Sequence, residues 1–263
     1  MKKIICIIAI LFAITISTNS YAQKERTRGI IWSYLHGLEY ELKAGVNIGG
    51  TAPLPLPSEI RKINSYSPNL ALSFGTEITK WFSDKAINKT GLIIGLRFET
   101  KGMTTQATVK NYGMEIIGDR GELVDGMWTG KVKTKVNNAY LTMPIMFAYK
   151  ATERWTVKAG AYFSYLLTGD FSGHVSDGYI RQDDPTGEKI VFDDGKTASY
   201  DFSKDLRKFQ WGAEIGGEWK ALKHFNVNAD LTWGINGIFK RDFKTITFKM
   251  YPIYLSVGFG YIF

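Results

Sequence analysis

Cysteine and histidine are scarce in this 263-residue chain, which has one cysteine and three histidines. The cysteine, Cys6, lies in an apolar N-terminal segment, so the rest of the chain has no thiol for a disulfide bond, a thiolate nucleophile or a cysteine metal site. His36, His174 and His224 lie far apart, and none is spaced from acidic residues as in a zinc site. We therefore expect no catalytic residue, no metal and no cofactor.

Long apolar runs are also missing, because after the N-terminal segment no stretch reaches the roughly 18 residues that predict a transmembrane helix. At the N-terminus, Lys2 and Lys3 precede an apolar core, and Ser20-Tyr21-Ala22 ends in a small-x-small pattern. This is typical of a secretory signal peptide cleaved near Ala22. We expect residues 1–22 to be the signal peptide, residues 23–38 a periplasmic lead-in and residues 39–263 a single β-barrel domain.

The formal net charge is +8, and losing Lys2 and Lys3 with the signal peptide leaves +6. A basic protein invites a nucleic-acid interpretation. However, the basic residues are interspersed with acidic ones, and the chain carries an export signal. We therefore expect no nucleic-acid partner.

What the chain has in abundance is alternation of apolar and polar residues with a period of two, which predicts β-strands. In the final segment, Tyr251 to Phe263, the odd positions are apolar or aromatic and most even positions are small or polar. Such segments have about ten residues, the length of a tilted strand that crosses a bilayer. The fold class that this predicts is all-β, an eight-stranded antiparallel up-and-down transmembrane β-barrel. The expected strands cover about 39–48, 70–79, 91–99, 140–149, 155–168, 209–219, 225–236 and 251–263.

The connections alternate in length, as in outer-membrane barrels with short periplasmic turns and long outer loops. We expect a loop at Pro53 to Pro57, long inserts over 102–137 and 169–206, and an edge or bulge at Pro144. Within the second insert, Asp193-Asp194-Gly195 predicts the turn of a projecting β-ribbon. Aromatic residues at the strand ends predict two interfacial girdles. Those at the short-turn end are Trp81, Tyr149, Trp155, Trp219, Phe225, Tyr261 and Phe263, and those toward the other end are Tyr165, Trp233 and Tyr251.

If the apolar face meets lipid, the opposite face lines the lumen and carries charges of both signs. An eight-stranded barrel has an interior just wide enough for side chains, so buried charges must pair. We expect a structural ion-pair core in which Arg97 pairs with Glu77 or Glu214, and glycines that make room for the long side chains. The alternative is a narrow ion path. The core residues expected are Glu41, Lys43, Glu77, Arg97, Glu99, Lys158, Glu214, Glu218 and Asp230, with Lys101 and Lys220 also on this face.

Two weaker patterns point to other chemistry. His174 lies near Ser172 and Ser176, which could belong to a lipid hydrolase, but closeness in sequence does not make a catalytic triad. The acidic stretch over 170–206 could hold a cation, but it lacks the spacing of a calcium-binding loop and is better interpreted as solvated turns.

Several stretches resemble a known family. Leu42-Lys43-Ala44-Gly45-Val46-Asn47, residues 95–102, Tyr140-Leu141-Thr142-Met143-Pro144-Ile145, residues 160–169 and the closing Gly-Phe-Gly-Tyr-Ile-Phe are similar to the PorT-like outer-membrane β-barrel family of Bacteroidetes-type bacteria. Thr142 stands where that family often has an acid. The resemblance implies an eight-stranded barrel with no shared active site. The ending, with Phe259, Tyr261 and Phe263, resembles the C-terminal signal that the barrel-insertion machinery reads.

The expected protein is therefore a non-enzymatic integral outer-membrane barrel. Its expected partners are outer-membrane lipid, the insertion machinery, and an extracellular or periplasmic protein or a glycan bound by the long outer loops. The alternatives are a lipid-modifying barrel enzyme, a small pore, or a soluble lipocalin-like carrier whose apolar face lines an internal cavity.

Overall fold

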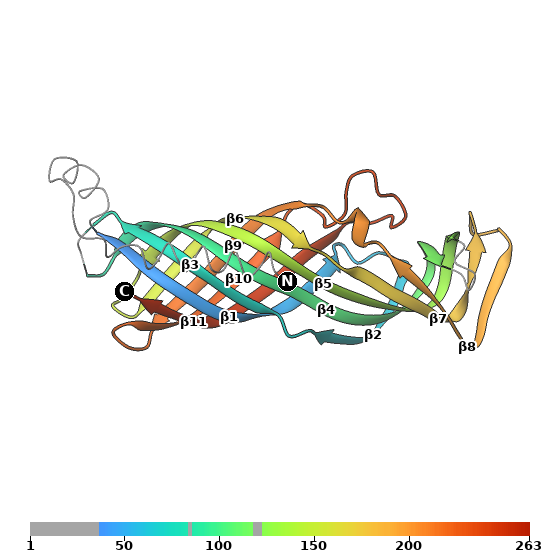
Figure 1. Ribbon diagram of the computed structural model, residues 1–263, viewed down its shortest axis with the longest axis horizontal. Helices are drawn as coiled ribbons and strands as arrows, with labels where there is room; N and C mark the ends of the chain where they lie inside the picture. The colour runs from blue at the N-terminus through green and yellow to red at the C-terminus, as the bar shows by residue number, and fades with distance from the viewer. Residues whose placement is uncertain (1–36, 84–85, 118–122) are drawn as a thin grey trace, which may run out of the picture. The chain divides into compact units, whose positions relative to one another are not determined.

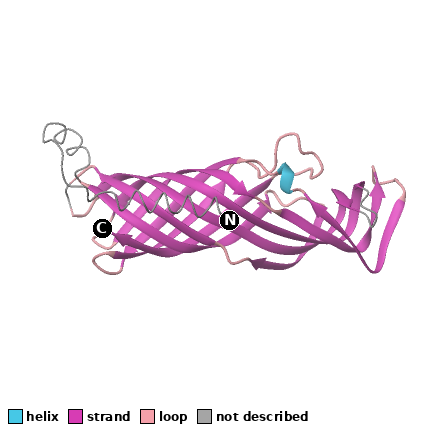
Figure 2. Ribbon diagram, viewed as in Figure 1, coloured by secondary structure: helices cyan, strands magenta, loops and turns pink. Residues whose placement is uncertain are grey.

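A computed structural model describes residues 37–83, 86–117 and 123–263 (Figures 1 and 2). Leu38–Phe263 forms one compact unit. The predicted signal peptide and nearly all of the predicted lead-in lie outside the described residues. Among those residues, no helix is both long enough and apolar enough to cross a membrane.

The described chain folds as an all-β antiparallel sheet of eleven strands with one short 3-10 helix, Ser203–Asp205, whereas the sequence predicted eight strands. The strands are β1 (Leu38–Pro53), β2 (Ile60–Pro68), β3 (Leu72–Trp81), β4 (Lys89–Ile117), β5 (Leu123–Lys150), β6 (Trp155–Thr168), β7 (Phe171–Gln182), β8 (Lys189–Asp201), β9 (Phe209–Lys220), β10 (Phe225–Gly234) and β11 (Met250–Ile262).

The strands that follow the predicted segments are joined in a closed circuit. Each pairs with the next in the order β1, β3, β4, β5, β6, β9, β10, β11. β11 then returns to β1, in register from Glu41 opposite Ile262 to Pro53 opposite Met250. The C-terminus lies at the end opposite β7 and β8 (Figure 1).

The stretch over 102–137, predicted as a loop, is instead the continuation of β4 and β5 beyond the circuit. There β4 pairs with β2 on one side and β5 pairs with β7 on the other. The prediction was wrong because the continuations of β4 and β5 have alternating inward and outward residues but no apolar outward face. In the run Lys131-Val-Lys-Thr-Lys135, for example, the outward positions are lysines that stand exposed.

The predicted ribbon exists, but its turn is in a different place. β7 and β8 form an antiparallel hairpin that turns between Gln182 and Lys189. Asp193-Asp194-Gly195 lies within β8, beside a shift in register, and Gly195 has a φ of 79° there. The Asp-Gly signal therefore marked a strand irregularity and not the end of the ribbon. β2, which follows the proline-rich loop, was not predicted at all.

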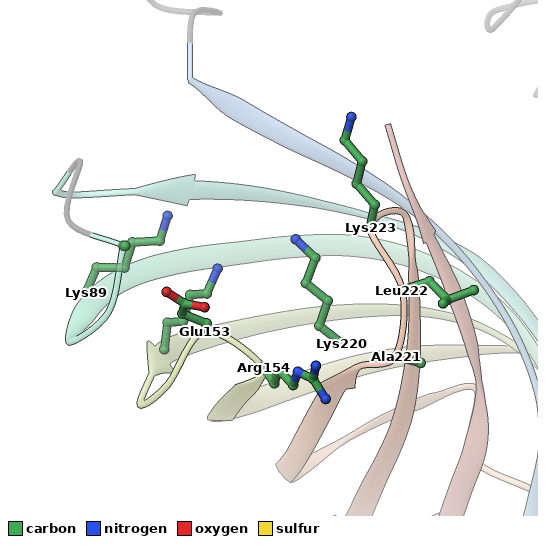
Figure 3. A pocket seen from close by; sticks show the side chains of 9 residues that line it. Lys89, Glu153, Arg154, Lys220, Ala221, Leu222 and Lys223 are labelled. Carbon is green, nitrogen blue, oxygen red and sulfur yellow. The ribbon is translucent and has the colours of Figure 1, made fainter.

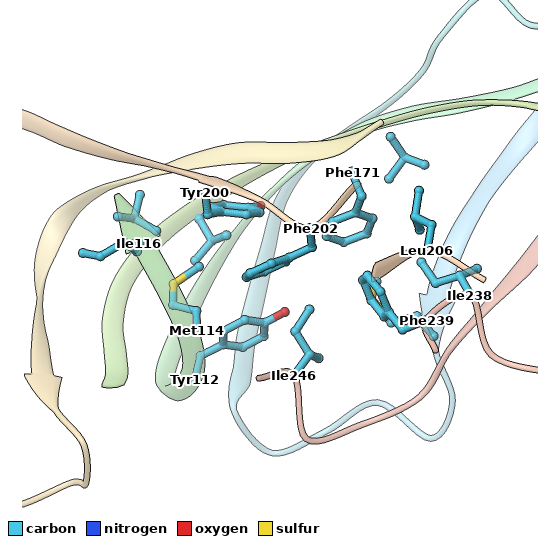
Figure 4. Packing of buried hydrophobic residues seen from close by; sticks show 14 of the residues in the cluster. Tyr112, Met114, Ile116, Phe171, Tyr200, Phe202, Leu206, Ile238, Phe239 and Ile246 are labelled. Atoms are coloured by element: carbon cyan, nitrogen blue, oxygen red, sulfur yellow. The ribbon is translucent and has the colours of Figure 1, made fainter. Parts of the chain in front are cut away.

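The part of the molecule that projects beyond the circuit, which we call the outer part, has its own hydrophobic core. This core is built between the extended ends of β4 and β5, β7, β8 and the segment after β10 (Figure 4). Phe171 and Phe239 pack edge to face with ring centroids 4.9 Å apart. Phe202 is stacked with Phe171 and packs edge to face with Phe239. Trp128 is fully buried against Phe192. Aromatic pairs of this kind contribute roughly 0.5–1.5 kcal/mol beyond their burial. This core fixes the strands that project beyond the circuit.

Within the circuit the two strand faces are oriented as predicted. In β11, Leu255, Val257 and Phe259 are exposed outward, whereas Tyr254 and Ser256 are buried inside. The same alternation holds in β1, β3, β9 and β10. Pro144 is neither at an edge nor at a bulge, because it lies within β5 opposite Tyr162 of β6. On the β4 side, where proline offers no N–H, pairing skips from Ile145 to Thr142.

Glycines admit the charged side chains, as predicted, at some positions only. A Cβ on Gly216 would collide with the Asp230 carboxylate, and one on Gly260 would collide with the Glu41 carboxylate. Gly212 and Gly258 approach neighbouring backbone instead. At these two glycines, an acidic side chain therefore occupies the space that a Cβ would need.

Adjacent glycines give a matched test. We expect Gly216→Ala to lower the free energy of unfolding by about 1–3 kcal/mol, because the methyl group overpacks the interior against Asp230. Gly217→Ala should cost nothing or stabilise slightly, because its nearest neighbour, the Thr156 carbonyl oxygen, is 3.9 Å away. Urea titration of both variants folded into phospholipid vesicles measures the difference. Equal effects would show that the interior is not close-packed at Gly216.

Candidate functional site

The part of the circuit interior nearer the short-turn end holds a cluster of ion pairs. The Lys43 ammonium lies 2.6 Å from Glu77 and also contacts Glu218. The Lys158 ammonium lies 2.8 Å from Glu218, 3.1 Å from Asp230 and 3.5 Å from Glu77. Lys158 is 1% exposed, so its charge is compensated by these carboxylates and not by water. Five strands, β1, β3, β6, β9 and β10, thus meet at two ammonium groups.

A second cluster lies along β4, further from the short-turn end. The Arg97 guanidinium donates to both carboxylate oxygens of Glu214, at 3.0 and 3.1 Å, and lies 3.1 Å from Glu99. Lys101 lies 3.0 Å from Glu99, and the Thr142 hydroxyl donates to the same carboxylate at 2.7 Å. A two-pronged arginine–carboxylate contact is among the stronger charged hydrogen bonds.

A layer of tyrosines covers this second cluster on its outer side. The Lys101 ammonium lies 5.1 to 5.6 Å from the ring centroids of Tyr140, Tyr162 and Tyr254. All three rings are at most 2% exposed. Cations interact favourably with the faces of aromatic rings at such distances. The layer separates the charges from the apolar core beyond it.

Three of the interior carboxylates, those of Glu41, Glu77 and Glu218, converge to within 4.8 Å, a spacing that suits a metal ion. Hard cations such as calcium prefer oxygen ligands of this kind. However, the Lys43 ammonium contacts Glu77 and Glu218 and lies 3.9 Å from Glu41. The amine occupies the position that a cation would take, so the geometry supports an ion-pair centre and not a metal site.

All nine residues predicted for the ion-pair core lie in this interior, in the two clusters just described. Of the two partners proposed for Arg97, the structure places Glu214 in contact, while Glu77 contacts the lysines. Lys220 lies at the rim instead. Sequence reasoning missed the tyrosine layer, although Tyr140 and Tyr162 occupy inward positions of their strands and could have been found there. The proposed insertion residues, Phe259, Tyr261 and Phe263, face outward and are 67%, 37% and 69% exposed.

The short-turn end carries a basic rim around a hollow of about 480 Å³ (Figure 3). Lys89, Lys150, Arg154, Lys220 and Lys223 line it, together with Glu153. Partial burial and the nearby charges of Lys89 and Lys220 lower the pKa of Lys150. This rim therefore presents an excess of positive charge at the end where the polypeptide terminates.

The residues considered for a hydrolase come close together but do not form a triad. His174 lies opposite Ser199 on β8, and Ser172 lies opposite Asp201. The Ser172 hydroxyl donates to Asp170 at 2.6 Å. No hydrogen bond joins the His174 ring to a serine among the described residues. Ser172, His174 and Ser199 line a hollow of about 620 Å³. Its lining also includes Lys133, Lys135 and Asp201.

The family comparison agrees with the fold. A family described as outer membrane protein beta-barrel domain matches residues 21–240. Among solved structures, the chain is similar to the attachment invasion locus protein Ail of Yersinia pestis in complex with sucrose octasulfate, at 11% identity over 86% of this chain and 99% of that one, with a TM-score of 0.36. It is also similar to OprG of Pseudomonas aeruginosa, at 13% identity over 86% and 95% of the chains, with a TM-score of 0.32. A third is the protease OmpT of Escherichia coli, at 12% identity over 86% and 96%, also with a TM-score of 0.32. No curated protein matches.

Removing one partner of a buried pair should be costly. We expect Arg97→Met to lower the free energy of unfolding by about 3–5 kcal/mol, because Glu99 and Glu214 are left buried without their common partner. Lys131→Met is the matched control, since it breaks a pair with Asp177 in which both side chains are about half exposed. Its cost should stay below about 1 kcal/mol. Urea titration in vesicles compares the two variants. A cost for Arg97→Met no larger than the control would mean that water reaches the cluster.

Proposed function

Because this chain belongs to the outer membrane protein beta-barrel domain family, we propose that its closed strand circuit spans the outer membrane as an eight-stranded barrel. In this proposal, residues 1–22 are removed as a signal peptide, and the aromatic C-terminus serves the insertion machinery. The observation that carries the proposal is a closed hydrogen-bonded circuit with exposed apolar side chains outside and buried ion pairs inside.

Each part of that observation has a physical reason in a bilayer. Closure leaves no unpaired strand edge within hydrocarbon, where an unsatisfied backbone group costs several kcal/mol. Outward residues such as Phe74, Phe147 and Ile215 are 52%, 69% and 57% exposed. A belt of this kind on a protein surface marks a contact with lipid or with another protein. The soluble-carrier alternative requires the apolar face to lie inside, and the structure has the opposite orientation.

The interior supports a structural role over a pore. Lys43, Arg97, Lys101 and Lys158 are nearly or fully buried and held by carboxylates from several strands. A path for ions would have to break these pairs, each of which replaces hydration that the groups have lost. We therefore propose a closed interior that braces the barrel wall.

The functional surface of the proposal is the outer part, where the role is binding and not catalysis. The hollow beside β5, β7 and β8 combines the amines of Lys133 and Lys135 with the hydroxyls of Ser172 and Ser199 and the ring of His174. One carboxylate, that of Asp201, also lines it, so the amines outnumber the acid by two to one. Amines and hydroxyls together suit a ligand that offers both negative charge and hydroxyl groups. Among the expected partners, a glycan with acidic sugars fits this chemistry best.

The membrane assignment is tested by fractionation and by gel mobility. We expect the protein in the outer-membrane fraction, with an unboiled mobility that differs from the boiled one, because a closed barrel resists unfolding by detergent. A soluble periplasmic pool with no mobility shift would overturn the proposal. Steady single-channel conductance in planar bilayers would overturn the closed interior in favour of the pore.

The binding surface is tested by reversing its charge. We expect Lys133→Glu with Lys135→Glu to reduce retention on an immobilised acidic polysaccharide by about tenfold or more, since each contact to a charged group contributes roughly 1.5–3 kcal/mol. The control reverses Lys62 and Lys110, which are exposed on the outer part away from the hollow. If both pairs have equal effects, attraction is general and the hollow is not a site. If neither variant nor wild type is retained, the glycan assignment fails.

A further inference from the structure

An apolar cavity of about 300 Å³ is lined mainly by residues of β1, β2, β4, β5, β7 and β11. Every residue that lines it is uncharged, in contrast to the charged interior of the circuit. One part of the lining is buried, including Met103, Val109 and Phe171, whereas Leu56, Ile63 and Tyr66 are exposed, so the cavity is open on one side. The lining includes Met103, Ala107, Val109, Tyr112, Val132 and Phe171.

Several polar groups of the lining have hydrogen-bond partners. The Thr134 hydroxyl is hydrogen-bonded to the Tyr200 hydroxyl at 2.6 Å, and the Tyr66 hydroxyl donates to the Gly49 carbonyl at 2.7 Å. The amide of Thr51 contacts the Met103 sulfur at 3.2 Å. Apolar cavities in proteins take apolar ligands in place of water. Ligand pockets also begin at about this size and are mainly apolar.

The cavity reaches the exterior through a seam in the wall. β1 pairs with β3 only as far as Val46 opposite Leu72, whereas it pairs with β11 up to Pro53. Beyond Val46 the next strand on that side is β2, which pairs with β4 and, among the described residues, has no ladder with β1. A hydrogen bond from the Tyr66 hydroxyl of β2 to the Gly49 carbonyl of β1 crosses this seam.

The strand register gives the height of the seam. Gly50 lies opposite Ile253, and Ile253 lies opposite Trp233, which is 52% exposed and belongs to the predicted outer girdle. Leu56 and Ile63, which line the mouth, are 58% and 56% exposed. Tryptophan prefers the boundary between lipid and water. The seam therefore opens at the outer interface of the barrel.

We infer that this cavity binds the alkyl chain of an amphiphile, which enters between β1 and β2 while its polar head stays at the outer interface. The height of the seam in the membrane rests on the proposed function, whereas the cavity and its chemistry do not. The chain has two candidate sources, a lipid of the outer leaflet and a free single-chain amphiphile. Both present the same methylene groups to the cavity.

Photolabelling tests the site. The folded protein in vesicles is irradiated with an alcohol that carries a diazirine on a medium-length alkyl chain, and labelled peptides are mapped by mass spectrometry. We expect label on cavity residues of β4 and β5 as well as on the outward belt. Ala107→Phe, which fills the cavity, should reduce the cavity label by about tenfold or more and leave belt label unchanged. Ala213→Phe, on the outward face of β9, is the matched control and should change neither.

The outcomes are separable. Label confined to the belt in wild type would overturn the inference, as would equal cavity label in wild type and Ala107→Phe. The mobility shift of each sample shows independently that the barrel is folded, so failure of the membrane assignment is distinguishable. Should Ala107→Phe not fold, Ala107→Leu fills less of the cavity, and a reduction in cavity label is still required.

Two further probes identify the source and the route. A phospholipid with the diazirine on one acyl chain labels the cavity if lipid supplies the chain, whereas label from the alcohol alone identifies a free amphiphile. Tyr66→Phe removes the hydrogen bond across the seam and keeps the aromatic ring. It should raise the rate of cavity labelling severalfold, and an unchanged rate would overturn the lateral route.

Discussion

The pairing of β1 with β11 is the constraint on which the rest of the structure depends. It joins the first described strand to the last and leaves both without a free edge within the circuit. Once the circuit is closed, every strand has one face inside and one outside, and a register slip of one residue would exchange them. Lys158 would then face outward and Val157 inward. Closure and the alternation of residue types therefore enforce each other.

The charged interior is better explained by this specificity than by stability. Buried ion pairs often contribute little net stability, because the desolvation of both groups offsets their attraction. Here the pairs join strands that lie far apart in the chain, such as Arg97 of β4 with Glu214 of β9. Wrong registers would leave single charges buried without partners, which is far more costly. The clusters thus discriminate against other pairings of strands that look alike in apolar pattern.

The sequence predicts the structure best where the two faces of a strand meet very different surroundings. The segments of the circuit alternate apolar and polar residues, so their strands, their orientation and the inward charges were predictable. The partner of Arg97 was not, because it depends on which strands come to face each other across the interior. The outer halves of β4 and β5 were missed because lysine and threonine occupy many of their positions, so no apolar outward face marks them as strands. β2 was missed because it follows three prolines and has no apolar period.

The order of the layers along the interior limits what the cavity can do. The rings of Tyr140, Tyr162 and Tyr254 surround the Lys101 ammonium, which is 3% exposed, and none of these rings lines the cavity. Methylene groups pushed further would separate Lys101 from Glu99 without replacing their attraction. The buried charges therefore close the interior of the circuit to alkyl chains. The apolar packing of the outer part closes the same interior to ions. A molecule that enters between β1 and β2 must leave by the same seam, so this geometry suits a protein that holds an alkyl chain and not one that conducts it across the membrane.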